Sequence, residues 1–271
     1  MIILFILLLI ILWFYYYYKN TVLHLWTFKM SSLSAVFRRE EKGVADLAFE
    51  MPNGVISPTN NKKTLICICS KSPNRHLYNC IDSLYKIQIR NSIDYNICII
   101  DSNSNNFTNY KKISKTFPNV KIHYIKNTNY EYGAWKYAIQ TYPDYKNYFC
   151  IQDSIIIKKH VDLNKIYIYI FKHNCGFNTH LDIKQIGIDI LKKNSVDYDD
   201  IIDTNFTIAA HCSFIVDNKI MNNLFNTLII PPTNKEESCA YERIFGIYFI
   251  KNNIITRDMN MYFKKIHGNR N

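Results

Sequence analysis

Four short apolar segments of this 271-residue chain are each followed by a polar side chain that could take part in chemistry. Ser70 ends the first segment, Asp101 the second and Asp153 the fourth, and Asn127 lies just beyond the third. Carboxylates can ligate a divalent cation or accept a proton. If the segments are parallel strands, their carboxyl ends meet at one edge of a sheet, where open α/β sheets bind ligands. Each residue could instead only stop a strand or cap a helix.

The spacing of apolar residues predicts the elements that would position these side chains. Predicted strands lie at 64–70, 95–100, 120–125 and 148–152, and predicted helices follow Ser72 and lie at 106–117 and 133–142. Ser72 is expected to cap the first helix, with Pro73 at its first position. Strands that alternate with helices favour βαβ units, a parallel sheet and helices on both of its faces.

The segment Ile99–Phe107 (IIDSNSNNF) resembles the VVDDGSTD element of GT-A glycosyltransferases, of the nucleotide-sugar-dependent family-2 type. Asp101 matches the first carboxylate of that element, which contacts the base or ribose of the nucleotide in the family. Ser104 matches its serine. Ser102 stands where the family has a second aspartate.

The segment Asn127–Ile139 (NTNYEYGAWKYAI) is similar to the NxGYDFGAWK element of the rhamnan-synthesis branch of bacterial glycosyltransferases. Glu131 stands for its Asp and Tyr132 for its Phe, and Asn129 replaces a glycine. The residues that match outright are Asn127, Tyr130, Gly133, Ala134, Trp135 and Lys136.

The segment Tyr148–Ile155 (YFCIQDSI) is similar to the LLNDS element of the same branch, at the place of the GT-A Asp-x-Asp motif. Asp153 and Ser154 match, and Gln152 replaces an asparagine. The resemblance covers residues 64–156. It implies a GT-A-like (Rossmann-like) α/β fold, a mostly parallel sheet flanked by helices.

The resemblance also implies a function: transfer of a sugar from a nucleotide-sugar donor to a hydroxyl of a glycan, lipid or protein. The residues then expected to bind the nucleotide or donor are Ser70, Asp101, Ser104, Asn127, Gly133, Trp135, Lys136 and Ser154. Trp135 could equally be a core aromatic residue. The alternative is a catalytically inactive protein of the same fold, because the metal motif lacks a second carboxylate.

A divalent cation, Mn²⁺ or Mg²⁺, held by Asp153 would neutralise the donor diphosphate and help it to leave. A complete Asp-x-Asp motif would supply two carboxylates, and this sequence supplies one. Lys126 or Lys136 could provide part of the cation's charge instead.

The C-terminal part contains the candidates for the acceptor side and for the catalytic base. A strand is predicted at 206–216, where the resemblance makes His211 and Ser213 acceptor-side residues, although a lone histidine on an apolar strand is also typical of a core. Helices are predicted at 221–228 and 236–250. An inverting transferase needs a carboxylate to deprotonate the acceptor hydroxyl. Glu242 and Glu237 are the candidates, and Glu242 could instead pair with Arg243.

The N-terminal segment Ile2–Tyr18 is a continuous apolar and aromatic run without a charged residue. It predicts one membrane-spanning helix with an aromatic belt at its end. A cleaved signal peptide is the alternative, but a basic n-region and a small-residue cleavage site are missing. The predicted organisation is an anchor at 1–26, a stem at 27–61, a GT-A-like domain at 62–250 and a basic tail at 251–271.

Charge and cysteine content narrow the remaining possibilities. Lys and Arg outnumber Asp and Glu by 33 to 22, a net charge of +11, which favours anionic partners. The basic residues are dispersed, so we expect no nucleic acid. Basic residues after the apolar run favour a cytosolic domain, whereas sequons at Asn106 and Asn205 would suit a lumenal one. The eight cysteines form no CxxC pair, so a zinc ribbon is not indicated.

Overall fold

The computed structural model describes residues 64–91, 95–159, 161, 167–177 and 181–266. The predicted anchor at 1–26 and stem at 27–61 lie outside these residues. No helix within the described ranges has the length and apolar character needed to cross a membrane.

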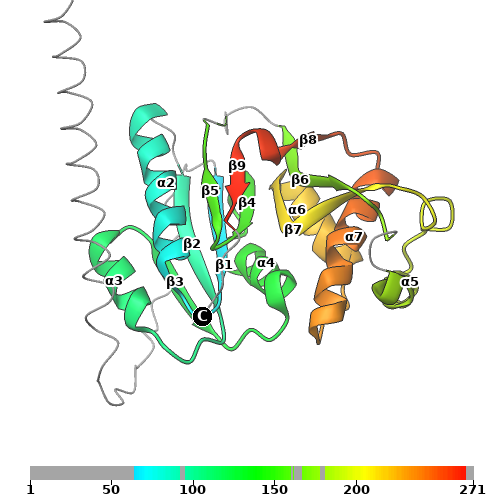
Figure 1. Ribbon diagram of the computed structural model, residues 1–271, viewed down its shortest axis with the longest axis horizontal. Coiled ribbons are helices and arrows are strands. Elements are labelled where there is room, and N and C mark those ends of the chain that lie inside the picture. Colours follow the sequence, from blue (N-terminus) through cyan, green and yellow to red (C-terminus); the bar gives the residue numbers. More distant parts are fainter. Residues whose placement is uncertain (1–63, 92–94, 160, 162–166, 178–180, 267–271) are drawn as a thin grey trace, which may run out of the picture. The chain divides into compact units, whose positions relative to one another are not determined.

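Within the described residues, seven strands form one sheet in the order β3-β2-β1-β4-β7-β6-β8 (Figure 1). Their bounds are β1 Thr64–Ser70, β2 Tyr95–Ser102, β3 Lys121–Ile125, β4 Asn147–Gln152, β6 Ile168–Asn174, β7 Thr207–Asp217 and β8 Thr256–Asp258. The first four strands are mutually parallel, as predicted, whereas β7 is antiparallel to both β4 and β6. A second, two-stranded sheet pairs β5 (Ile155–Ile157) with β9 (Phe263–Lys265) in antiparallel fashion.

The helices cover both faces of the parallel strands. Their bounds are α2 Arg75–Asn91, α3 Thr108–Thr116, α4 Tyr130–Thr141, α5 Lys184–Lys193, α6 Asn218–Thr227 and α7 Lys235–Lys251, with short 3₁₀ turns at Leu181–Ile183 and Met259–Met261. Right-handed crossovers place α2 and α3 on one face and α4 on the other, as Figure 1 shows. Helix α4 packs on β1 and β2, and α7 packs along β7.

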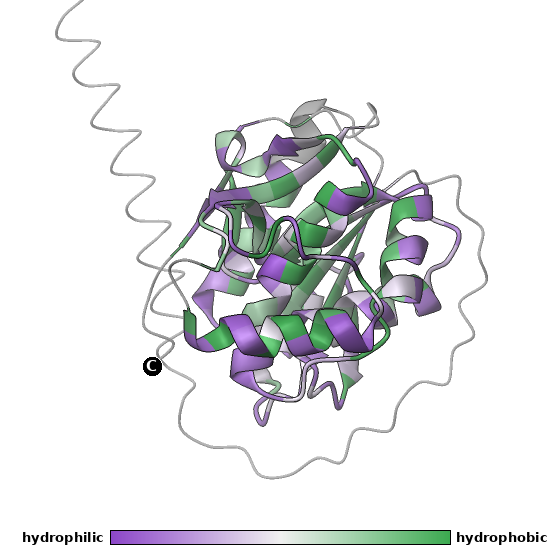
Figure 2. Ribbon diagram, turned by 90° about the vertical axis from the view of Figure 1, so that its right-hand side faces the viewer, coloured by the Kyte–Doolittle hydropathy of each residue, from purple (hydrophilic) through white to green (hydrophobic). Residues whose placement is uncertain are grey.

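Burial on both sides explains why the strands read as apolar runs. Every residue of β1 is buried, and β2 and β4 are buried over almost their whole length. Figure 2 shows the strands mainly in the hydrophobic colour and the helices alternating between the two colours. That is the pattern expected of a parallel sheet between amphipathic helices. All eight cysteines are free, and seven of them are buried.

The start of the first helix differs from the prediction. Helix α2 begins at Arg75, and the side chain of Asn74 accepts a hydrogen bond from His76 N (2.8 Å). Ser72 adopts a left-handed backbone conformation (φ 56°), and its N–H donates to Ser104 Oγ (2.8 Å). Ser72 therefore lies in the loop between β1 and α2, where it binds the loop that follows β2, and it does not cap the helix.

Part of the predicted basic tail at 251–271 forms short strands. Strand β8 pairs with β6, and β9 pairs with β5. Residues 168–171, which follow an uninterpreted part of the sequence, belong to β6. Helix α5 and strand β5 were not predicted.

Two helical glycines make close contacts with neighbouring elements. A Cβ atom added to Gly246 in α7 would lie 2.4 Å from Thr207 O and 2.9 Å from Ile208 Cα, which are backbone atoms of β7. A Cβ atom added to Gly187 in α5 would lie 2.4 Å from Cζ of Phe177, which belongs to a side chain. The first neighbour is a backbone fixed by sheet pairing, whereas the second is the tip of a side chain.

The variant Gly246→Ala should lower the free energy of unfolding by about 1–3 kcal/mol, because β7 or α7 must move. Gly187→Ala should cost less, because its Cβ atom meets the tip of a side chain and not a backbone, and because alanine favours a helix over glycine by about 0.5–1 kcal/mol. Urea denaturation of both variants measures the difference. A Gly246→Ala protein as stable as wild type would contradict the close packing of α7 on β7.

Candidate functional site

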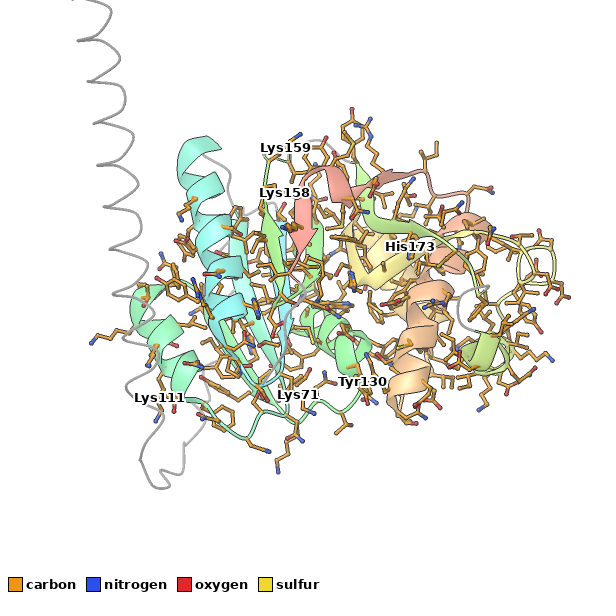
Figure 3. The ribbon with its side chains drawn as sticks, in the orientation of Figure 1. Lys71, Lys111, Tyr130, Lys158, Lys159 and His173 are labelled. Atoms are coloured by element: carbon orange, nitrogen blue, oxygen red, sulfur yellow. The ribbon has the colours of Figure 1, made fainter. Side chains whose placement is uncertain are left out.

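Three of the polar residues predicted at strand ends meet at one edge of the sheet. In the parallel register Ser70 is the partner of Asp101, and Cys69 is the partner of Gln152, the residue before Asp153. Ser70 Oγ donates to Asp153 Oδ2 (3.0 Å). We call Ser70, Asp101 and Asp153 the strand-end cluster. Figure 3 labels Lys71, directly after β1, and Tyr130, at the start of α4, along this edge.

Asp101 organises the loop that follows β2. Its carboxylate accepts hydrogen bonds from Ser104 N (3.0 Å), from Ser104 Oγ and from Tyr110 Oη (2.7 Å). Burial is the main cause that raises the pKa of the Tyr110 hydroxyl, which is therefore protonated and donates. Asp101 is only 2% exposed. Its loop-capping role is thus visible in the structure, and contact with a nucleotide remains a prediction. Tyr110 had no signal in the sequence beyond helical spacing.

Asn127 fixes the loop between β3 and α4. Its Nδ2 donates to Ser102 Oγ (2.9 Å) and to Tyr130 O (2.7 Å), and its Oδ1 accepts from Asn129 N (2.9 Å). A Cβ atom on Gly133 would lie 2.1 Å from Asn127 Oδ1. The glycine of the GAWK segment therefore serves to let this asparagine loop lie against α4.

A cavity of about 330 Å³ adjoins this loop. Asn127 and Gly133 line it, together with Lys126 and Lys136. The predicted donor residues therefore separate into two places, the strand-end cluster and this cavity, which we call the α4 cavity. Asn127 connects them, because it also contacts Ser102 at the end of β2.

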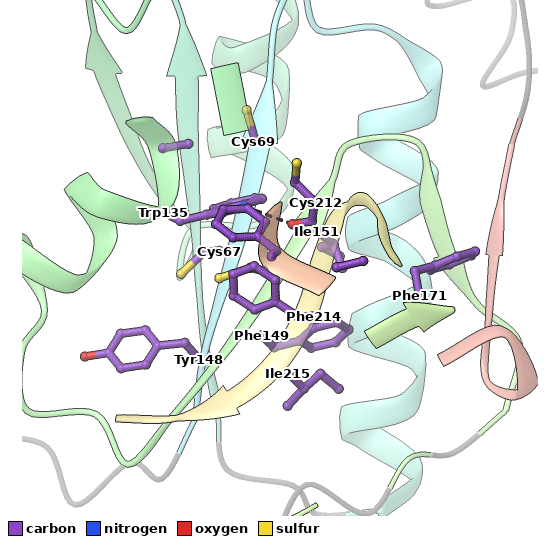
Figure 4. Close-up of a cluster of buried hydrophobic side chains, with 14 of the residues drawn as sticks. Cys67, Cys69, Trp135, Tyr148, Phe149, Ile151, Phe171, Cys212, Phe214 and Ile215 are labelled. Atoms are coloured by element: carbon purple, nitrogen blue, oxygen red, sulfur yellow. Dashed lines mark hydrogen bonds between the residues drawn. The ribbon is translucent and has the colours of Figure 1, made fainter. Parts of the chain in front are cut away.

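Trp135 and Ser213, two residues of the predicted site, are both 0% exposed. The indole Nε1 of Trp135 donates to Cys212 O (3.0 Å), as the dashed line in Figure 4 shows. Ser213 Oγ donates to His211 O (3.0 Å). Trp135 thus joins α4 to β7 within the core, and Ser213 supports a bend of its own strand. Neither side chain has surface with which to contact a donor or an acceptor.

Strand β7 contains a bulge at His211 and Cys212. Both residues have left-handed backbone conformations (φ 59° and 47°), and the register with β6 shifts between Ile170 and Lys172. Such conformations cost non-glycine residues on the order of 1–3 kcal/mol each and persist only where the surroundings enforce them. Here Glu242 Oε1 accepts the His211 N–H (2.9 Å), and Trp135 binds the carbonyl of Cys212.

Glu242 holds this bulge and also pairs with Arg243 (Nη1 to Oε2, 3.1 Å). Its side chain is 23% exposed. Burial raises the pKa of Glu242, against the lowering effects of the His211 N–H and the Arg243 charge. Arg243 is buried and also donates to the carbonyls of Gly176 and Cys239. The predicted ion pair therefore exists, and Glu242 still retains an exposed part and a carboxylate that is easier to protonate than usual.

Glu237, the other predicted base, caps α7. Its Oε2 accepts from Thr233 N (2.6 Å) and Thr233 Oγ1 (2.9 Å), and its own N–H donates to Asn234 Oδ1 (2.9 Å). This arrangement resembles a capping box, except that the Glu237 side chain reaches the residue before the N-cap Asn234. Of the two candidates, the structure therefore leaves Glu242 as the carboxylate inside the fold and gives Glu237 a role at the helix start.

A second polar group, which sequence reasoning did not select, adjoins Asp153. Glu131 Oε1 accepts from Gln152 Nε2 (2.6 Å), and Glu131 Oε2 accepts from Ser238 Oγ of α7 (3.4 Å). Lys265 Nζ donates to Gln152 Oε1 and to Ser154 Oγ (2.5 Å). Glu131 lies inside the YEYGAWK motif and could have been chosen from it. Lys265 lies in the predicted tail and gave no signal.

The residues around Asp153 do not form a good site for a divalent cation. Among the residues that the structure describes, no three His, Cys, Asp or Glu side chains gather closely enough to hold a metal ion. One Asp153 oxygen accepts the Ser70 hydrogen bond, and Lys265 binds the side chains on either side. Binding of Mn²⁺ or Mg²⁺ at Asp153 stays a prediction. The side chains at this place fit such an ion poorly.

The variant Gly133→Ala should displace Asn127 from Ser102 and lower the free energy of unfolding by about 1–3 kcal/mol. The matched control is Gln140→Ala, an exposed residue two turns further along the same helix, which should change stability by less than about 0.5 kcal/mol. Urea denaturation of both proteins tests this. Equal stability of the two variants would show that the loop does not depend on the glycine.

No protein-family model matches this chain, and no curated protein matches it. Among solved structures it is similar to S. aureus TarS (12% identity, TM-score 0.42, 76% of this chain and 37% of that chain). It is also similar to the WbbM bifunctional glycosyltransferase (14% identity, TM-score 0.38, 65% of this chain and 35% of that chain). A third similar structure is a TarS fragment in complex with UDP-GlcNAc (12% identity, TM-score 0.44, 76% of this chain and 59% of that chain). The chain thus spans about a third to three-fifths of these chains, and likeness at this level does not by itself assign an activity.

Proposed function

We propose that this chain is a glycosyltransferase that moves a sugar from a nucleotide-sugar donor to a hydroxyl acceptor with inversion, anchored to a membrane by residues 1–26. The observation that carries the proposal is the strand-end cluster. Ser70, Asp101 and Asp153 come from three different strands and meet at the carboxyl edge of a parallel sheet. This is where α/β sheets bind nucleotides, and the motifs that resemble glycosyltransferases supply two of these three residues.

The donor lies at this edge in our proposal. The nucleoside sits beside the β2 loop that Asp101 holds through Ser104 and Tyr110. The diphosphate then lies toward Asp153 at the end of β4. Asn127 sets the shape of the neighbouring loop through Ser102.

Glu242 acts as the general base in this proposal. It removes the proton from the acceptor hydroxyl while that oxygen attacks the anomeric carbon. The bond from the anomeric carbon to the diphosphate oxygen breaks, and its electron pair leaves with the nucleoside diphosphate. Because attack and departure occur on opposite faces of the sugar, the product configuration is inverted. The left-handed bulge at His211 gives Glu242 its hydrogen bond partner and fixes one carboxylate oxygen.

Glu131 connects the proposed donor and base regions. It binds Gln152, which precedes Asp153, and Ser238, which lies one helical turn before Glu242. Its charge also contributes to the raised pKa of Glu242. The charge of Lys235 lowers the pKa of Glu242. These contacts support a single site that spans the edge of the sheet and the first turns of α7.

A catalytically inactive protein of the same fold is the second candidate. The observation that favours it is the burial of both strand-end carboxylates, 2% for Asp101 and 5% for Asp153, with hydrogen bonds to protein groups. Thermal-shift measurements with UDP-, GDP- and dTDP-sugars, with and without Mn²⁺, separate the candidates. A transferase is stabilised by at least one donor, whereas no shift with any donor favours the inactive protein.

The variant Glu242→Gln should lower the rate of donor hydrolysis by about 10²–10⁴-fold, the usual contribution of a general base. Glu237→Gln is the matched control, because an amide still accepts the capping hydrogen bonds, and it should keep near wild-type activity. Release of nucleoside diphosphate from the donor that gives the largest thermal shift measures both. If Glu242→Gln hydrolyses that donor at the wild-type rate, Glu242 is not the base.

The pH dependence of hydrolysis should also report Glu242. The base works as the carboxylate, so the rate falls as the pH decreases through the pKa of Glu242. Because burial raises this pKa, the fall should occur at a higher pH than for an ordinary carboxyl group of pKa about 4.3. In Glu242→Gln, a rate profile recorded from neutral to acidic pH should not show this fall. If both proteins show the same fall, a group other than Glu242 causes it.

A further inference from the structure

Lys265 is held beside Asp153 by the pairing of two strands distant in sequence. Strand β9 is antiparallel to β5, with Lys265 opposite Ile155. The N–H of Ile266 donates to Ser154 O (2.8 Å). The backbone on both sides of the Lys265 side chain is therefore fixed at the turn that follows β4.

The ammonium group of Lys265 binds the two side chains that flank Asp153. It donates to Gln152 Oε1 and to Ser154 Oγ (2.5 Å). Asp153 and Lys265 also act on one common neighbour, the buried thiol of Cys80. Its pKa is raised mainly by burial, is raised further by the Asp153 charge and is lowered by the Lys265 charge. The positive charge of Lys265 therefore lies in the immediate surroundings of Asp153.

This arrangement conflicts with a divalent cation at the same place. Mg²⁺ requires near-octahedral oxygen ligands and is usually held by one or two carboxylates and by phosphate. The neutral side-chain oxygens on either side of Asp153 in the chain are those of Gln152 and Ser154, and both are already hydrogen-bonded to the ammonium of Lys265. A divalent cation would also be repelled by that ammonium at such short range.

We propose that Lys265, in place of a divalent cation, supplies the positive charge that binds the diphosphate of the donor. The proposal rests on the glycosyltransferase function proposed above. An ammonium group is a well-established phosphate ligand that acts as a point charge, and the hydrogen bonds to Gln152 and Ser154 hold this charge in place. Charge on the departing diphosphate would be stabilised by a fixed lysine, so binding and departure need no metal ion.

The other lysines considered for this role lie elsewhere. Lys126 and Lys136 line the α4 cavity, and Lys136 Nζ lies over the ring of Tyr132 (5.7 Å to its centre). Lys235 lies over the ring of Tyr130 (5.8 Å). Lys265 binds both neighbours of Asp153, which is why it is assigned here.

The test is calorimetric titration of the full chain with UDP, GDP and dTDP, and with the corresponding monophosphates, in EDTA and then in Mn²⁺ or Mg²⁺. Lys265→Met should lower the affinity for the diphosphate that binds best by about 10- to 100-fold, as expected for loss of a hydrogen bond to a charged group. Its affinity for the monophosphate should change little. Lys265→Arg should restore most of the diphosphate affinity. Lys264→Met, an exposed neighbour on the same strand, is the matched control and should bind as wild type.

Each outcome decides the question. Diphosphate binding in EDTA that Lys265→Met selectively weakens supports the proposal. Diphosphate binding that requires Mn²⁺ or Mg²⁺, equal affinities of Lys265→Met and wild type, or an equal loss of monophosphate affinity overturns it while leaving the transferase function in place. If no nucleotide binds under either condition, the proposed function fails first, and the role of Lys265 fails with it.

Discussion

The parallel pairing of β1 with both β2 and β4 is the constraint on which the site depends. This pairing sets Ser70 beside Asp101 and brings Asp153 within hydrogen-bond distance of Ser70. Because the side chains of a strand alternate between faces, a slip of one residue would turn these groups away from one another. The full burial of β1 specifies the register, since any slip would expose apolar side chains. The same packing that stabilises the fold therefore assembles the polar cluster.

The bulge in β7 is the second element that links stability to chemistry. Two non-glycine residues in left-handed conformations are costly, and two contacts enforce them: Glu242 on the amide of His211 and Trp135 on the carbonyl of Cys212. Trp135 thus affects the site without touching a ligand, because it fixes the strand against which Glu242 is placed. In this account, Glu131 joins that region to the end of β4 through Gln152.

The sequence predicted the parts of the structure that local patterns determine. It did not predict the parts that contacts between distant residues determine. Apolar runs with polar ends predicted β1 to β4 and their common edge, because burial on both faces leaves a continuous apolar signal. Trp135 could be read as a ligand contact or as a core residue, and only the packing shows that it is buried. Lys265 was missed because it reaches Ser154 across 111 residues through an antiparallel pair of three-residue strands. Likewise, the residue types of His211 and Cys212 do not predict a bulge with left-handed backbone conformations.

The central claim is that a nucleotide binds at the carboxyl ends of β1, β2 and β4. A crystal structure of the chain with the nucleoside diphosphate that binds best tests it most directly. The account predicts the nucleoside beside the Asp101 loop and the diphosphate against the ammonium group of Lys265. A nucleotide bound instead in the α4 cavity, against Lys126 and Lys136, would contradict it.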